Sequence, residues 1–202
     1  MKKDNYLNKI AESKKPFIIY KSNKGFDLFT DFSKKIILSN RNIENFINNS
    51  TKKKLKNKET DLYIGFFGYE ILNNLIDVKI KKQKGLKFPK GIFYKPETKK
   101  KLSNKLNYKP TDNSKSKGIF NINLNKVSYK NIFNKFKKKI KLGETYQIKI
   151  CTKYRKNSQI DALDFFCRLT KSNMAPEAFM INDKDYSIIS CSPENLITKT
   201  KN

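Results

Sequence analysis

The sequence of 202 residues contains no histidine and no tryptophan, and only three of its 45 basic residues are arginine. Without histidine, the chain cannot form a His-based metal site or the Ser-His and Cys-His pairs of nucleophilic enzymes. Arginine binds phosphate through two parallel hydrogen bonds, so its scarcity argues against a surface selected for nucleic acid. These absences exclude several common kinds of catalytic and binding site.

Cysteine is also scarce. The three cysteines, Cys151, Cys167 and Cys191, are an odd number, and no two of them are close in the sequence. Cys151 and Cys191 fall inside apolar runs, where a free cysteine behaves as a small hydrophobe. The first residues lack the apolar run of a signal peptide, and no stretch approaches the roughly 20 apolar residues of a membrane span. We therefore expect a cytoplasmic protein with no membrane partner.

The net charge of +27 leaves two interpretations of the surface. Clustered lysines bind polyanions by releasing counterions, so a basic nucleic-acid-binding protein is one alternative. The lysine runs, however, occur with abundant asparagine and isoleucine, as a codon bias toward A and T would produce. We favour a solvated lysine surface, and a nucleic-acid partner stays the alternative.

Residues 16–94 have the pattern of an α+β unit, and 37% hydrophobic content is sufficient for a core. Short apolar runs at 17–20 and 35–38 predict buried strands, and helical spacing of Ile43, Phe46 and Ile47 predicts a short helix. Residues 61–69 predict a strand in which Gly65 and Gly68 mark a bulge or a close backbone approach. A helix is predicted to follow at 70–76.

Residues 95–117 are rich in Lys, Pro, Asn, Ser and Thr and have few aliphatic side chains. This composition predicts a lysine-rich linker. We therefore divide the chain into a first region, 1–117, and a second region, 118–202.

The second region begins with a predicted helix that Ser128 caps and Gly143 ends. Residues 143–153 alternate apolar and polar side chains and predict a strand. A second helix begins at Asp161. Residues 178–181 and 186–191 then form a predicted hairpin across the turn-rich residues 182–185. One face of the first helix is apolar, with Tyr129, Ile132, Phe133, Phe136 and Ile140.

Several segments, in order along the chain, resemble component I of aminodeoxychorismate synthase and anthranilate synthase, the chorismate-binding enzymes. The family's early strand ends in a Glu-Ser or His-Ser pair. In residues 15–22 of this chain, Lys21 replaces the first member of that pair, and Ser22 keeps the second. The other segments are 25–28, 61–70, 87–94, Tyr146-Gln147, Asn173-Met-Ala-Pro176 and Ser192-Pro193-Glu194.

The resemblance implies an α+β fold of antiparallel sheets flanked by helices, as an incomplete component I fold. It also implies amination of chorismate, Mg²⁺ as cofactor and ammonia from a glutamine amidotransferase partner. The products would serve para-aminobenzoate and folate synthesis or tryptophan synthesis, and segments 25–28 and 173–176 favour the para-aminobenzoate branch. Family members continue well beyond the position of Asn202, through their magnesium ligands. We therefore expect an inactive chain on its own, and a fragment that pairs with a separate C-terminal half is a further alternative.

The resemblance also assigns site residues. Glu194 would be the catalytic acid or base, with a pKa raised by burial at a strand end. Ser22, Asn173, Ala175 and Pro176 would correspond to a tryptophan pocket, although this chain lacks the aromatic residue that the family has after Pro176, and Glu177 stands one residue short of its usual spacing. Two simpler interpretations stay open: Ser192-Pro193-Glu194 as a surface helix start, and Pro176 as the end of a loop before a strand.

Overall fold

The computed structural model describes residues 6–52, 62–71, 89–110 and 119–191. The chain forms two compact units, and each is described by itself. The first combines Met1–Pro110 with Ala162–Asn202, and the second is Thr111–Asp161. This grouping differs from a sequential division at residue 117, because the segment after Asp161 returns to the first unit.

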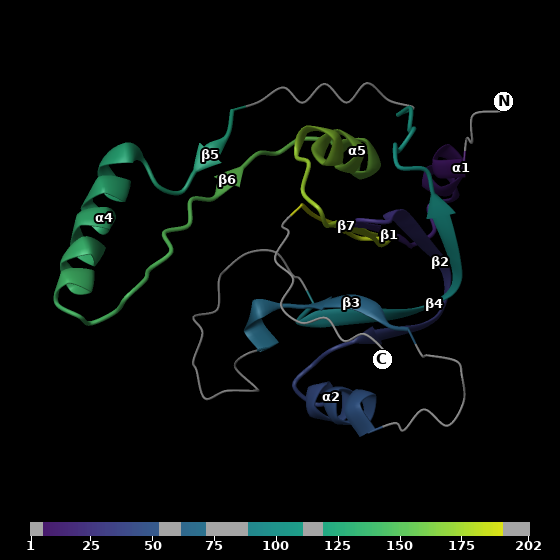
Figure 1. Cartoon of the computed structure of the whole chain (residues 1–202), viewed down its shortest axis with the longest axis horizontal. Helices are drawn as coiled ribbons and strands as arrows, with labels where there is room; N and C mark the ends of the chain where they lie inside the picture. The colour runs from purple at the N-terminus through teal and green to yellow at the C-terminus, as the bar shows by residue number, and fades with distance from the viewer. Residues whose placement is uncertain (1–5, 53–61, 72–88, 111–118, 192–202) are drawn as a thin grey trace. The chain divides into compact units, whose positions relative to one another are not determined.

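The first unit is built on a six-stranded antiparallel sheet in the order β3-β4-β2-β1-β7-β8 (Figure 1). The predicted α+β class, with antiparallel sheets flanked by helices, is confirmed. The strands are β1 (Phe17–Ser22), β2 (Gly25–Ile37), β3 (Ile64–Phe67), β4 (Gly91–Leu102), β7 (Ala178–Asn182) and β8 (Ser187–Ser190).

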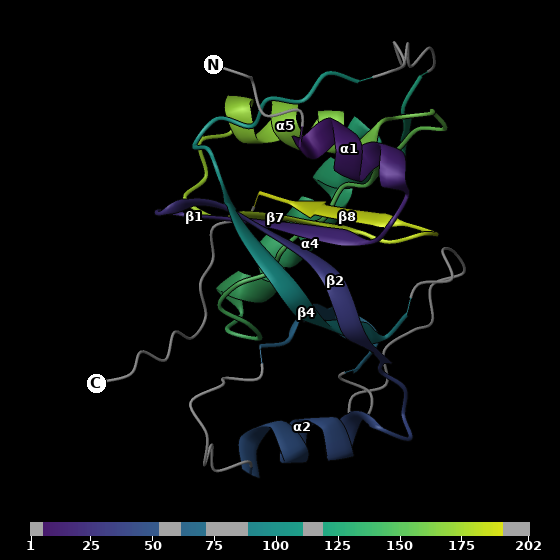
Figure 2. The same ribbon diagram turned by 90° about the vertical axis from the view of Figure 1, so that its right-hand side faces the viewer.

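The sheet curls because β2 and β4 are long and bent. Their pairing register shifts between Phe32 and Lys34, and the nearby Asp31 adopts a left-handed φ of 52°. Such a bulge bends a strand and increases its twist. Figure 2 shows β2 and β4 turning away from β1, β7 and β8, so that the two ends of the sheet face different helices.

One face of the β1, β2 and β7 part of the sheet is covered by α1 (Tyr6–Ser13) and α5 (Ala162–Ser172) (Figure 2). Side chains two apart on a strand share a face, so Phe17 and Ile19 of β1 both point into this layer. Full burial of one such side chain stabilises the fold by about 1.5–3 kcal/mol. The buried members are Leu7, Phe17, Ile19, Phe26, Leu28, Leu163, Phe166, Ala178 and Met180.

The opposite face carries a second buried cluster, and α2 (Ile43–Lys52) packs against a third. The second cluster contains Ile18, Phe29, Ile92, Tyr94 and Ile181. The third joins Ile43 of α2 to Leu38 after β2 and to Ile71 of the short 3-10 helix η1 (Tyr69–Ile71). Gly65 in β3 lies so close to β4 that a Cβ there would stand 2.7 Å from Cα of Phe93.

The second unit consists of α4 (Lys126–Lys141) and a two-stranded ladder of β5 (Asn121–Ile122) with β6 (Tyr154–Arg155). The helix begins earlier than predicted, because Asn125 is its cap and accepts a hydrogen bond from the backbone N–H of Ser128 at 2.8 Å. Gly143 ends it as predicted, with a left-handed φ of 73° and an N–H donated to Ile140.

Three sequence predictions were wrong in part. Residues 95–102, expected in a linker, form two-thirds of β4, because lysine side chains on the exposed part of a strand look like loop composition. Residues 143–153 form no strand, so Cys151 is exposed rather than packed. The strand expected at 35–38 is the end of β2, which begins at Gly25.

Other predictions hold or lie outside the described residues. The hairpin of β7 and β8 and the helix α5 are confirmed. The strand expected at 61–69 is β3, four residues long. Most of the helix expected at 70–76 and the linker residues 111–117 lie outside the described residues. Within the described part of the chain, no helix is long and apolar enough to cross a bilayer.

Candidate functional site

The end of β1 meets the turn that follows α5. Lys21 is paired with Ala178 in the β1–β7 ladder, and its ammonium donates a hydrogen bond of 2.6 Å to the carbonyl oxygen of Ala175. Ala175 is buried, so its carbonyl oxygen needs a donor from the protein. Lys21 supplies that donor and fixes the turn against the sheet.

The same turn is fixed to the end of β8. Asn173 follows the last residue of α5, and its backbone N–H donates to the carbonyl of Leu169 at 2.8 Å. Its side-chain amide donates to the carbonyl oxygen of Cys191 at 3.4 Å. Burial raises the pKa of the Cys191 thiol, and the positive charge of Lys21 partly offsets this rise. Lys21, Asn173, Ala175 and Cys191 therefore define one place, which we call the β1–β8 junction.

Of the four predicted pocket residues, Asn173 and Ala175 contribute directly to this junction. Ser22 is adjacent to Lys21 in the chain, but its hydroxyl accepts a hydrogen bond from the N–H of Lys24 at 3.2 Å. This bond stabilises the tight turn to Gly25, whose φ is 100°. Pro176 is exposed in the bend before β7, so its place fits the simpler loop interpretation as well as the pocket interpretation.

Glu177 is positioned near Tyr20 of β1. Burial raises the pKa of the Tyr20 phenol, and the charge of Glu177 and a hydrogen bond with it raise that pKa further. This chain therefore has a carboxylate beside Tyr20, close to the β1–β8 junction. The negative charge of Glu177 would repel an anionic ligand at the junction.

Glu194, the predicted catalytic residue, lies outside the described residues. It follows Cys191 by three positions in the sequence. The described structure shows that β8 ends at Ser190 and is followed by Cys191. The role of Glu194 stays a prediction.

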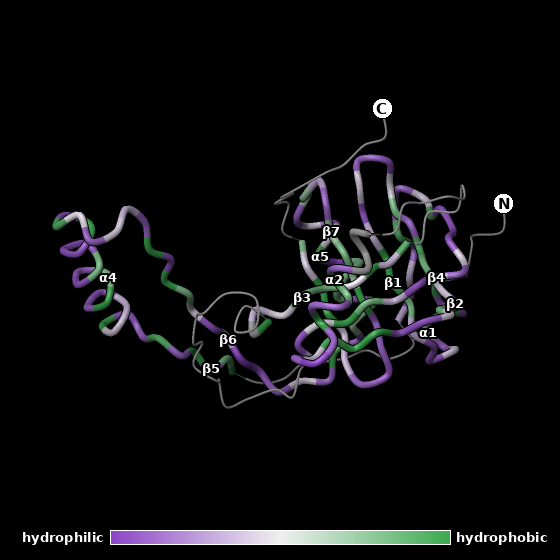
Figure 3. Tube along the Cα trace, turned by 90° about the horizontal axis from the view of Figure 1, so that it is seen from below, coloured by the Kyte–Doolittle hydropathy of each residue, from purple (hydrophilic) through white to green (hydrophobic). Residues whose placement is uncertain are grey.

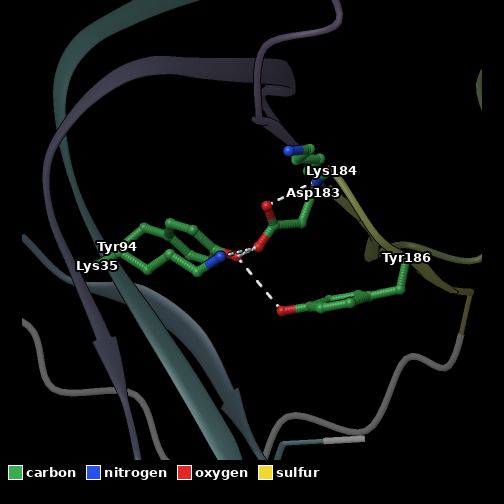
Figure 4. Close-up of polar contacts among 5 residues, drawn as sticks. All are labelled: Lys35, Tyr94, Asp183, Lys184 and Tyr186. Carbon is green, nitrogen blue, oxygen red and sulfur yellow. Dashed lines mark hydrogen bonds and ion pairs between the residues drawn. The ribbon is translucent and has the colours of Figure 1, made fainter. Parts of the chain in front are cut away.

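A second polar cluster is shown in Figure 4, and its Tyr94 belongs to the buried cluster on the sheet face opposite α1 and α5. Asp183, in the turn between β7 and β8, has a side chain only 4% exposed. Its carboxylate accepts hydrogen bonds from the ammonium of Lys35 at 2.5 Å, from the Tyr94 hydroxyl, and from the N–H of Lys184 at 2.7 Å. The hydroxyls of Tyr94 and Tyr186 are 3.4 Å apart.

Electrostatics keep Asp183 ionised in this cluster. Burial raises its pKa, but hydrogen bonds from Lys35, Tyr94 and the backbone of Lys184 outweigh burial, so the pKa lies below its ordinary value. The pKa of Tyr94 is raised, first by burial and then by its bond to Asp183. The cluster thus joins the β7–β8 hairpin to β2 and β4 through one charged group.

Sequence analysis missed this cluster and the role of Lys21. Asp183 was interpreted only as one of the turn-rich residues 182–185, and Tyr94 only as the end of segment 87–94, which resembles the family. The only sign of the Asp183 cluster in the sequence was an acidic residue in a turn between two apolar strands. This pattern is too common to be diagnostic. Within the described residues, no three His, Cys, Asp or Glu side chains group in a way that could hold a metal ion.

Comparison with known proteins gives the family. A family model described as "chorismate binding enzyme" matches residues 6–202. Anthranilate synthase component 1 of Buchnera aphidicola subsp. Rhopalosiphum padi is 32% identical over 99 residues, which are 49% of this chain and 19% of that protein. The protein of the same name from Buchnera aphidicola subsp. Schizaphis graminum is 29% identical over 125 residues, 62% of this chain and 23% of that protein.

The matched segments thus span about a fifth of the length of these curated relatives. The family model, by contrast, covers almost the whole of the present chain, including all of the residues at the β1–β8 junction. This chain therefore belongs to the chorismate-binding enzyme family.

Proposed function

We propose that this chain is part of a component I synthase that aminates chorismate with ammonia from a glutamine amidotransferase. The observation that carries the proposal is the β1–β8 junction. Lys21 at the end of β1 and Asn173 and Ala175 in the turn after α5 lie beside Cys191, from which the chain continues to Ser192-Pro193-Glu194. Two of the segments that resemble the family in sequence, 15–22 and 173–176, are therefore adjacent in space.

In this proposal, the junction positions the start of the catalytic segment. The Asn173 amide holds the carbonyl of Cys191, and Lys21 holds the turn that carries Asn173. Glu194 would then protonate the hydroxyl that leaves chorismate, or take a proton from the attacking ammonia. A carboxyl does this best when its pKa is raised toward neutrality.

Magnesium is the cofactor that we propose for the assembled synthase. The described residues offer no cluster of ligands that fits a metal ion. We therefore assign Mg²⁺ no ligand in this part of the chain and derive no step through it.

We also propose that tryptophan binds at the β1–β8 junction, at Asn173 and Ala175 and beside the neighbouring Ser22 and Pro176. Thermal unfolding of the chain with millimolar tryptophan tests this proposal. Tryptophan should raise the melting temperature, because a ligand that binds only the folded state stabilises it. Asn173→Ala should abolish the increase, and Asn182→Ala serves as a control. An unchanged melting temperature in the parent chain would reject the tryptophan site.

The branch of the family is part of the proposal. Segments 25–28 and 173–176 favour aminodeoxychorismate, whereas both curated relatives are named anthranilate synthase component 1. We propose the anthranilate branch, because the relatives rest on longer alignments than those two short segments.

Product analysis tests both the activity and the branch. The chain is combined with the region that follows the matched segment in the Rhopalosiphum padi relative, produced as a second polypeptide, and supplied with chorismate, ammonia and Mg²⁺. Anthranilate should form, and its fluorescence and mass identify it. Aminodeoxychorismate instead would correct the branch, and an assembled complex that forms neither product would reject the proposed activity.

A further inference from the structure

Basic residues are spread along the chain, so a run of lysines does not by itself mark a binding site. Hydrophilic stretches alternate with hydrophobic ones in both units of the trace in Figure 3. Only three of the 45 basic residues are arginine, and lysine does not replace arginine where an anionic group is held through two parallel hydrogen bonds. The positions that hold arginine are therefore the informative ones.

Arg41 differs from the other arginines in its surroundings. Arg168 of α5 is paired with Asp164 at 2.9 Å, and Arg155 belongs to β6 of the second unit. Arg41 is exposed in the loop between β2 and α2. Among the residues that the structure describes, it forms neither a hydrogen bond nor an ion pair, although Glu44 follows three positions later in α2. Its guanidinium is therefore available to a ligand.

The side chain of Arg41 lines a hollow in the first unit. The hollow has a volume of about 550 Å³, which lies within the range of roughly 300–1,000 Å³ for small-molecule pockets. Two of its lining side chains are cationic, and none is acidic, so the hollow attracts an anion. The lining residues are Leu38, Ser39, Asn40, Arg41 and Lys90.

The loop that carries Arg41 is fixed to the sheet. The N–H of Leu38 donates a hydrogen bond to the carbonyl of Gly91, next to Lys90 in the chain, at 2.8 Å. The N–H of Ser39 donates to the side-chain oxygen of Asn42 at 2.8 Å, and the side-chain amide of Asn42 donates to the carbonyl of Ile37 at 2.9 Å. A ligand in the hollow therefore binds without first ordering this backbone, which saves conformational entropy.

We propose that the hollow binds the phosphate group of a small phosphate monoester. Arg41 donates two parallel hydrogen bonds to the phosphate oxygens. Lys90, whose ammonium also donates to the side chain of Asn40, adds a second positive charge, and the Ser39 hydroxyl adds a donor. A phosphate monoester carries about −1.5 to −2 charges at neutral pH, which matches the two cations. The volume of the hollow leaves room for the organic part beside Leu38.

This hollow is separate from the β1–β8 junction. It adjoins the end of β2 at Ile37, whereas the junction adjoins Ser22, which pairs with Gly25 at the start of β2. The 13 residues of β2 lie between the two places along the strand. The inference is therefore independent of the proposed synthase activity, and its test uses no turnover measurement.

Isothermal titration calorimetry with the full 202-residue chain tests the proposal. The probes are inorganic phosphate, glycerol phosphate and AMP, and succinate is the carboxylate control. At about 0.15 M salt, which screens a diffuse lysine surface, both monoesters should bind at one site per chain with a dissociation constant below about 1 mM. Succinate should bind about tenfold more weakly or not at all.

Variants of the arginines locate the site. Arg41→Ala should weaken monoester binding about tenfold or more, as expected for lost hydrogen bonds to a charged group. Arg41→Lys, which keeps the charge and removes the planar fork, should also weaken it. Arg168→Ala is the matched control and should leave binding unchanged. Because Arg41 is exposed, these changes should not unfold the chain, and circular dichroism verifies this.

Nuclear magnetic resonance of the arginine side chains gives a second, independent measurement. The chain has only three arginines, so labelling arginine with nitrogen-15 gives three Nε–H signals, which the variants assign. Glycerol phosphate should shift the Arg41 signal and leave those of Arg155 and Arg168 in place.

Four results would overturn the proposal. Equal affinity of the parent chain and Arg41→Ala, or equal shifts of all three arginine signals, would show a diffuse basic surface. Succinate that binds as tightly as the monoesters would show a general anion site. Inorganic phosphate that binds as tightly as both monoesters would name free phosphate as the ligand. An oligonucleotide that binds through Arg41, when neither monoester binds, would name a nucleic acid instead.

Discussion

Replacement of Asp183 by alanine should destabilise the six-stranded unit by about 2–4 kcal/mol. The carboxylate is buried and accepts hydrogen bonds from Lys35, Tyr94 and the N–H of Lys184. Hydrogen bonds to a charged group contribute about 1.5–3 kcal/mol, and a buried donor left without an acceptor costs a further 1–3 kcal/mol or so. Lys35 is 41% exposed, so water recovers part of its loss.

Urea unfolding followed by far-ultraviolet circular dichroism measures this change. Asp185→Ala is the matched control, because Asp185 lies in the same turn and is exposed; its cost should stay within about 0.5 kcal/mol. Tyr94→Phe removes only the buried hydroxyl, and the double variant should cost less than the sum of the two single changes. Equal stability of Asp183→Ala and Asp185→Ala would refute the role that we give to the cluster.

The pH dependence of the same change has a definite sign. The folded-state pKa of Asp183 is lowered, so its ionised form stabilises the fold. This contribution is fully present above the unfolded pKa of about 3.9 and is lost as the pH falls through the folded pKa. The stability difference between the parent chain and Asp183→Asn should therefore be constant near neutrality and shrink below about pH 4. A difference that grows on acidification would contradict this reasoning.

Two further predictions concern the backbone and the basic surface. Gly65→Ala should destabilise β3 by more than about 2 kcal/mol, because its Cβ would clash with the backbone of β4; Gly143→Ala, in open space at positive φ, should cost about 1 kcal/mol, and urea unfolding compares the two. The lysine surface should bind duplex and single-stranded nucleic acid weakly and without sequence preference, with binding almost lost at physiological salt in a fluorescence anisotropy titration. A sequence-selective complex at that salt would support the nucleic-acid alternative instead.

The sequence predicted those elements whose pattern is local. The spacing of Leu163 and Phe166 identified α5, and two apolar runs around a turn identified the β7–β8 hairpin. Gly65 was interpreted as a bulge or a close backbone approach, and its distance to β4 fits the second of these. For α5 and the hairpin, residues close together in the sequence contain both the pattern and its cause, whereas the close approach at Gly65 is to β4.

Features that depend on distant partners were missed. The strand β4 continues through Lys99 and Lys101 because β2 pairs with it, and lysine composition alone suggested a linker. The cluster around Asp183 combines residues from β2, β4 and the β7–β8 turn, so no sequence window contains it. Residues 146–152 show the converse, since a local strand pattern forms no strand where the described structure provides no neighbour.

The sequence selected two of the residues at the β1–β8 junction, and the role that it assigned to them stays a prediction. Resemblance to the family selected Asn173 and Ala175, and the structure brings both to the β1–β8 junction. It gave no role to Lys21, which was treated only as a departure from the family's pattern. An ammonium whose partner is a backbone carbonyl 154 positions away leaves no signature in a single sequence.

The most direct test of the central claim is the Glu194→Gln variant in the assembled synthase. Chorismate turnover is measured with saturating ammonia and Mg²⁺, while size-exclusion chromatography verifies assembly. We expect turnover to fall about 100-fold or more, because a positioned general acid or base contributes at least that factor. Undiminished turnover in the assembled variant would contradict the proposed catalytic role of this chain.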